Sequence, residues 1–94
     1  MDEKLFESEV KKVIDIAKEY GAEKIILFGS CIGDIKSAQD IDIAVAGVKP
    51  EFFFEMYGKI LSETLTDMDL IPLEYAREHF SKRIFEQGRL LYAR

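Results

Sequence analysis

The sequence has no tryptophan, one cysteine and two prolines among its 94 residues. Because Cys31 has no second cysteine to pair with, no internal disulfide can hold the chain together, which suits a reducing compartment. Long apolar runs are also missing, since none approaches the roughly 20 residues that span a membrane. Met1–Lys4 is charged where a secretory signal would lead into an apolar segment. We therefore expect a cytoplasmic protein that does not enter a membrane.

Positive charge is in short supply. The chain has 13 Lys and Arg against 18 Asp and Glu, and the net charge of −5 is unevenly spread: residues 75–94 carry +3 and residues 1–74 carry −8. Because duplex binding depends on many contacts between cations and phosphates, we expect no broad nucleic-acid-binding surface. An acidic protein that handles phosphates would need a metal ion between the two negative parties.

The residues that are present suffice for one small core. Apolar residues make up 48% of the chain and charged residues 33%, which is typical of globular proteins, and the length allows one domain, 1–94. Apolar residues at helical spacing and nearly continuous apolar runs predict, in turn, helices at 3–20, 50–64 and 75–87 and strands at 24–28, 41–46 and 68–71. Residues 31–39 indicate a loop or one short helical turn, and residues 89–92 a final strand or an edge extension. The expected fold is α/β (α+β), a small mixed β-sheet with helices packed on it, in the order α-β-α-β-α-β.

Two pairs of aspartates stand at the beginnings of predicted strands. Asp40 and Asp42 share one face of a strand because side chains alternate between its faces. Two such carboxylates repel each other unless they face water or share a cation such as Mg²⁺. The same spacing recurs at Asp67 and Asp69, where Asp69 precedes apolar Leu70 and needs a partner from elsewhere in the fold. A solvated strand end and a shared metal site both remain open for each pair taken alone.

Gly29 and Ser30 follow the first predicted strand. Glycine allows a close approach of backbone to phosphate, and serine adds a hydroxyl, although such a pair also makes an ordinary turn. A Gly-Ser strand end, nine intervening residues, an Asp-x-Asp strand and a third aspartate on a later strand form a rarer combination. Together they supply the parts of a metal-dependent phosphoryl or nucleotidyl transfer site.

With these motifs, Leu27-Phe28-Gly29-Ser30 and Asp40-Ile41-Asp42-Ile43-Ala44-Val45, the sequence resembles the DNA polymerase beta-like nucleotidyltransferases, and by its length their minimal, stand-alone members. The resemblance runs from about Lys24 to Tyr92 and implies the palm-like nucleotidyltransferase fold. It implies that Gly29 and Ser30 hold the nucleoside triphosphate, with Lys36 the only cation of the following loop. It implies further that Asp40, Asp42 and Asp69 are the catalytic and metal-binding residues, with Asp69 preferred to Asp67 as the third carboxylate.

The chain departs from the family pattern after Gly29-Ser30. Cys31, Ile32 and Gly33 occupy positions where relatives of this size often have basic residues, and Gln39 stands where a serine commonly precedes the first aspartate. Two functions are therefore expected. The first is transfer of AMP from ATP, with two Mg²⁺ ions, to a hydroxyl acceptor. The alternative is a catalytically weak or inactive nucleotide-binding module that acts by docking onto a partner protein.

The resemblance also implies a partner, because members of the minimal group often accompany a HEPN-domain protein and some act as antitoxins that adenylylate it. Phe52, Phe53 and Phe54 cannot all face one core, because consecutive helical residues point about 100° apart. Phe53 is expected to join the core with Tyr57, Ile60 and Leu61. Phe52 with Met56, or Phe54, is left for another side, which is either a wide apolar face or the docking surface; homo-oligomer formation stays open.

Five other residues allow more than one role. The cations Arg77, Lys82 and Arg83 form either a solvated helix face or a group near substrate phosphates. His79, the only histidine, has no second histidine or cysteine at metal-ligand spacing and is expected to be a structural or solvent-exposed residue. Cys31 is expected to fill space as a small apolar residue, and a reactive thiol would need a lowered pKa.

Overall fold

The computed structural model covers residues 1–94 and describes all of them except the side chain of Ser30. The chain forms, in order, α1 (Glu3–Glu19), β1 (Lys24–Phe28), the short 3-10 helix η1 (Gly29–Ile32), β2 (Ile41–Ala46), α2 (Pro50–Glu63), β3 (Met68–Pro72), the 3-10 turn η2 (Leu73–Tyr75), α3 (Glu78–Gln87) and β4 (Arg89–Ala93). Among the described residues, no helix is long and apolar enough to cross a membrane.

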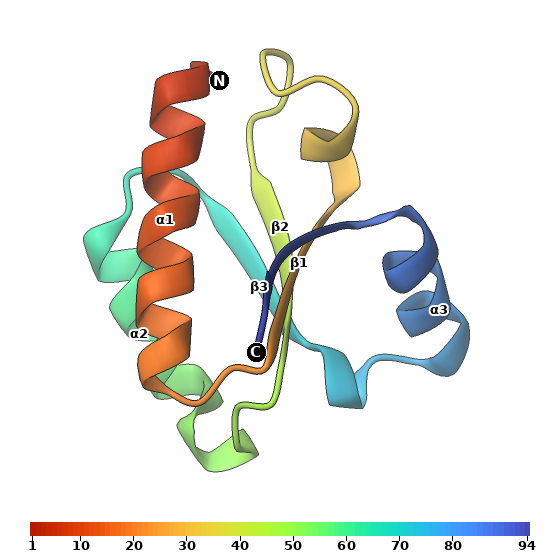
Figure 1. Ribbon diagram of the computed structural model, residues 1–94. Helices are drawn as coiled ribbons and strands as arrows, with labels where there is room; N and C mark the ends of the chain where they lie inside the picture. The colour runs from red at the N-terminus through yellow and green to blue at the C-terminus, as the bar shows by residue number, and fades with distance from the viewer.

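The four strands form one sheet in the order β3-β2-β1-β4 (Figure 1). Strand β1 pairs antiparallel with β2 and β4, and β2 pairs parallel with β3. The mixed sheet is therefore confirmed, but the strict α-β alternation is wrong, because η1 and a loop alone connect β1 to β2. Antiparallel neighbours need no long crossover, whereas the parallel pair β2 and β3 requires one, and α2 provides it.

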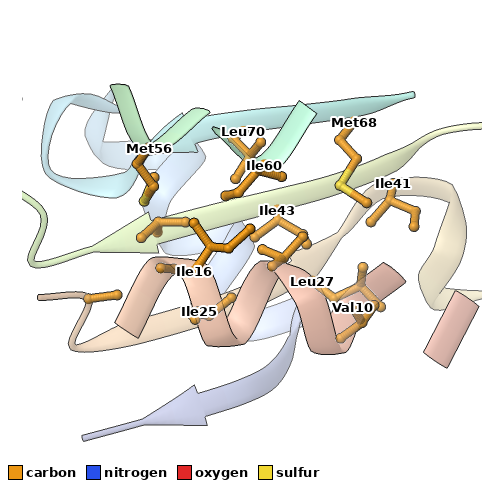
Figure 2. Packing of buried hydrophobic residues seen from close by; sticks show 14 of the residues in the cluster. Val10, Ile16, Ile25, Leu27, Ile41, Ile43, Met56, Ile60, Met68 and Leu70 are labelled. Carbon is orange, nitrogen blue, oxygen red and sulfur yellow. The ribbon is translucent and has the colours of Figure 1, made fainter. Parts of the chain in front are cut away.

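The helices cover both faces of the sheet. Figure 1 shows α1 and α2 on one side and α3 on the other. The larger core lies under α1 and α2 (Figure 2) and takes Ile25, Leu27, Ile41, Ile43, Met68 and Leu70 from the strands. The smaller core lies under α3 and combines Ile26, Ala44, Leu73 and Ile84. Burial on both faces explains why β1 reads as a nearly continuous apolar run.

Helix α1 ends as the glycine at its end predicts. Gly21 has φ +89°, a conformation in which a side chain is disfavoured. Its N–H donates to the Lys18 carbonyl over 3.1 Å, and the Ala22 N–H donates to the Ala17 carbonyl over 3.0 Å. These two bonds are those of a Schellman motif, which turns the chain towards β1.

Two details of the predicted helices need correction. In α2, Phe53, Met56 and Ile60 are buried at a spacing of three and four residues, whereas Leu61 is largely exposed. Met56 therefore belongs to the core and Leu61 does not, because the helix presents a narrower stripe than its apolar content suggests. The last helix begins at Glu78 rather than near residue 75, because η2 occupies residues 73–75 first.

A buried carboxylate connects α1 to the start of β3. Glu9 is completely buried, and its Oε1 accepts hydrogen bonds from the backbone N–H groups of Leu65 and Thr66, each over 2.6 Å. Burial raises the pKa of Glu9, but these bonds and the charge of Lys12 outweigh it, so the pKa lies below its usual value. Glu9 thus fixes the loop that leads to Asp69, a role that the helical pattern did not reveal.

Replacement of Glu9 with alanine should lower the free energy of unfolding by about 2 kcal/mol, because two backbone donors lose their acceptor. Because its folded pKa is lowered, Glu9 stabilises the fold above its unfolded pKa, and that contribution disappears as the pH falls through the folded pKa. Glu9→Gln keeps an acceptor but should lose this acid-dependent part. Chemical denaturation at several pH values measures both effects. Glu7→Gln, an exposed carboxylate of the same helix, is the control, and equal effects at both positions would contradict the role of Glu9.

Candidate active site

Three side chains from neighbouring strands form one row across the sheet. In the strand register, Phe28 of β1 lies opposite Asp42 of β2, and Asp42 lies opposite Asp69 of β3. All three project from the face that α3 covers, since their neighbours along each strand enter the larger core on the opposite face. Parallel pairing of β2 with β3 therefore brings together two aspartates that are 27 positions apart in the sequence.

The electrostatics of this row centre on Asp42. Its side chain is half-buried, and burial raises the pKa of Asp42. The Asp69 carboxyl raises that pKa further, through repulsion between the two charges and through a hydrogen bond with the protonated form, and Asp40 adds a smaller repulsion. A cation placed between Asp42 and Asp69 would relieve this repulsion.

Gly29 directly follows Phe28 at the end of β1 and lies against Asp42. It has φ +78°, and a Cβ built on its backbone would overlap the Oδ2 atom of Asp42. Only glycine combines this backbone conformation with such a close approach to a carboxylate. The glycine of the Gly-Ser turn is therefore required by its contact with the Asp-x-Asp strand, in addition to any contact with a ligand.

The other aspartates of the two Asp-x-Asp pairs, Asp40 and Asp67, lie outside this row. Asp40 directly precedes β2 with an exposed side chain, and its charge acts weakly on Asp42. Asp67 lines a different cavity, with Leu5, Ala38 and Gln39, so Asp69 rather than Asp67 faces Asp42. In the described part of the chain, no three His, Cys, Asp or Glu side chains gather closely enough to form a metal site by themselves.

In the turn after β1, Cys31 serves as a small buried residue. The Cys31 thiol is buried and donates a hydrogen bond to the Asp40 carbonyl over 3.3 Å, which joins η1 to the start of β2. Burial, and then repulsion from Asp42, raises the pKa of the Cys31 thiol, which argues against a reactive thiolate. Lys36 lies exposed in the following loop, where its N–H donates to Asp34. The side chain of Ser30, also predicted to bind nucleotide, lies outside the described residues.

A cavity of about 370 Å³ adjoins Gly29. Phe28, Ile32, Phe80 and Ile84 form its apolar walls, and Arg83 and Gln87 of α3 add polar groups. The rings of Phe28 and Phe80 meet edge to face with centroids 5.9 Å apart. No local sequence pattern predicts this cavity, because α3 comes next to η1 only in the folded chain; the group of cations on that helix was the one signal.

The family model for polymerase beta nucleotidyltransferases matches residues 11–94. The chain belongs to this family. The resemblance inferred from Gly29-Ser30 and Asp40-x-Asp42 is thereby confirmed, and so is the nucleotidyltransferase fold. No protein with curated annotation matches the sequence.

Solved structures extend the comparison to toxin–antitoxin pairs. A toxin–antitoxin complex with AMP-PNP is similar at 27% identity and TM-score 0.74, covering 89% of this chain and 73% of that one. The MNT antitoxin bound to tri-AMPylated HEPN toxin from Shewanella oneidensis is similar at 26% identity and TM-score 0.71, covering 94% and 72%. The MntA–HepT toxin–antitoxin is similar at 25% identity and TM-score 0.70, covering 94% and 73%. All three are toxin–antitoxin pairs, and in one of them the toxin is a HEPN toxin.

The donor set around Asp42 suits a hard divalent cation. Mg²⁺ in proteins is commonly held by one or two carboxylates together with water and substrate phosphates, rather than by a complete protein cage. The facing carboxyls of Asp42 and Asp69, with Asp40 nearby, match this description. The repulsion that raises the pKa of Asp42 is the strain that such a cation would remove.

Gly29→Ala should lower the free energy of unfolding by about 1–3 kcal/mol, since φ +78° is unfavourable for alanine and the new Cβ displaces the Asp42 carboxylate. Gly33→Ala, in the same segment, is the matched control, because Gly33 has φ −85° and nothing lies within 4 Å of its built Cβ. Thermal or chemical unfolding of the two variants provides the comparison. Equal stability of both would contradict the close packing of Gly29 on Asp42.

Proposed function

We propose that the protein is a metal-dependent nucleotidyltransferase that transfers AMP from ATP to a hydroxyl group of a HEPN-type toxin partner. The observation that carries the proposal is the pairing of Asp42 with Asp69 beside Gly29, in a chain of the polymerase beta nucleotidyltransferase family. A similar toxin–antitoxin is complexed with AMP-PNP, and a similar MNT antitoxin is bound to an AMPylated HEPN toxin. Both support ATP as donor and a HEPN protein as acceptor.

The proposed reaction needs few groups from the chain. Gly29 and Ser30 hold the triphosphate at the turn after β1, with Lys36 as a further cation in the same loop, while Asp40, Asp42 and Asp69 bind Mg²⁺. When bound, Mg²⁺ neutralises the phosphates and the departing pyrophosphate. The acceptor oxygen attacks the α-phosphorus, the bond from that phosphorus to the β-phosphate oxygen breaks, and pyrophosphate leaves. Asp69, the more exposed of the facing pair, orients the acceptor hydroxyl and takes up its proton.

The partner is proposed to dock at the outer edge of β3. A cavity of about 340 Å³ opens there, lined by Pro50, Phe53, Phe54, Tyr57, Leu70, Pro72 and Tyr75. Phe54 is 80% exposed and Tyr75 66% exposed, so two large rings remain uncovered beside an unpaired strand edge. Phe52 and Phe54 point to nearly opposite sides of α2, about 160° apart. The patch therefore centres on Phe54 rather than on both rings.

Asp42→Asn should reduce AMP transfer to the co-purified HEPN partner by about 10²–10³-fold, because it removes a charge that the metal-bound phosphates require. Transfer is measured with ATP labelled in the α-phosphate, with and without Mg²⁺. Asp67→Asn is the matched control, because it makes the same chemical change directly before β3, where Asp67 lines a different cavity.

Equal transfer by the wild type and Asp42→Asn would overturn the enzymatic proposal. If neither protein transfers AMP while both still bind and neutralise the partner, the protein acts by docking alone. The absence of basic residues at Cys31, Ile32 and Gly33 is the observation that favours this second function.

Phe54→Ser should weaken the complex with the HEPN partner at least about tenfold, since a large exposed ring is lost from the proposed contact. Folding should be unaffected, because the ring is mostly in solvent. Phe52→Ser is the matched control on the same helix. Affinities from titration calorimetry that are unchanged for Phe54→Ser, or reduced equally for both variants, would place the interface elsewhere.

A further inference from the structure

The active-site face has a shortage of positive charge close to the proposed triphosphate position. Asp42 and Asp69 face each other on this face with Asp40 nearby, and no Lys or Arg stands between Ser30 and Lys36. A bound nucleoside triphosphate adds further negative charge, only part of which a divalent ion neutralises. A cation from another element is therefore needed near Gly29.

Helix α3 has three cations close together in sequence, and the structure distinguishes them. Arg77 is the residue that precedes the helix. Lys82 lies exposed, 4.0 Å from Glu86 one turn further along the helix, and does not line the cavity beside Gly29. Arg83 lines the cavity beside Gly29, together with Phe28 and Gln87. Of the three, Arg83 alone is placed in that cavity.

Gly29 connects this cavity with the carboxylates. Its backbone forms part of the cavity wall, and its Cα approaches Asp42 so closely that no Cβ fits between them. A nucleotide whose phosphates reach Gly29 therefore has the aspartates on one side and Arg83 on the other. Within the part of the chain that the structure describes, no carboxylate forms an ion pair with Arg83. Its guanidinium keeps five N–H donors available for phosphate oxygens.

We propose that Arg83 binds the phosphates of the nucleoside triphosphate from α3, beside a loop that has no Lys or Arg between Ser30 and Lys36. This inference rests on the proposed function, because it concerns the same nucleotide. A guanidinium can bind two phosphate oxygens at once, whereas an ammonium acts as a point charge. Arg83→Lys should therefore retain part of the affinity, and Arg83→Gln should lose the contribution of the charge.

The test measures the affinity of AMP-PNP with Mg²⁺ for the full chain by titration calorimetry. Arg83→Gln should weaken binding about tenfold or more, the usual effect of losing a hydrogen bond from a charged group, and Arg83→Lys should lie between Arg83→Gln and the wild type. Lys82→Gln, the neighbouring cation on the same helix, should bind as the wild type does. Thermal unfolding should show that all variants are folded, since Arg83 is exposed.

Two results would overturn the inference, and they differ from failure of the proposed function. The first is wild-type affinity in Arg83→Gln while Asp42→Asn loses Mg²⁺-dependent binding; Arg83 then has no part in a nucleotide site that exists. The second is an equal loss in Arg83→Gln and Lys82→Gln, which would indicate a general charge effect of α3. Absence of AMP-PNP binding by the wild-type protein itself would remove both the proposed function and the role of Arg83.

Discussion

The site depends on the parallel pairing of β2 with β3. This register sets Asp42 opposite Asp69, and the antiparallel pairing of β1 with β2 sets Phe28 and the turn at Gly29 beside them. The larger core determines the register, because a shift by one residue would exchange Ile41 and Ile43 with Asp42 and drive a carboxylate under α1. Hydrophobic packing on one face therefore maintains a repulsive pair of charges on the other face, and a divalent cation is the ligand that such a pair favours.

Three residues around the site fix the backbone that carries this repulsive pair of carboxylates. Glu9 accepts the backbone N–H groups of the loop before β3 and so fixes where that strand begins. Cys31 joins η1 to the Asp40 carbonyl. Gly29 allows the chain to pass against Asp42. Each of these residues acts on backbone position rather than on a ligand, and together they hold the strands and the turn of the candidate site in place.

The chain belongs to the polymerase beta nucleotidyltransferase family, and the groups around the Gly-Ser turn give its candidate site a particular charge distribution. Cys31, directly after the Gly-Ser turn, is buried and contributes packing rather than charge. Arg83 enters the neighbourhood of the same turn from α3, across the cavity beside Phe28. Arg83 thus brings positive charge near Gly29 from a distant part of the sequence, which is the physical basis of the proposed nucleotide contact.

The sequence by itself determined the strands, most helix boundaries, the mixed sheet and the identity of the acidic residues, because apolar periodicity and glycine positions are local signals. It did not determine which aspartate faces Asp42. Asp67 and Asp69 are two residues apart, as Asp40 and Asp42 are, and only the strand register places Asp69 opposite Asp42. The buried role of Glu9, the exposure of Leu61 and the separation of Arg83 from Lys82 were equally out of reach. Each of these depends on which distant element packs against a side chain, and local periodicity carries no record of that contact.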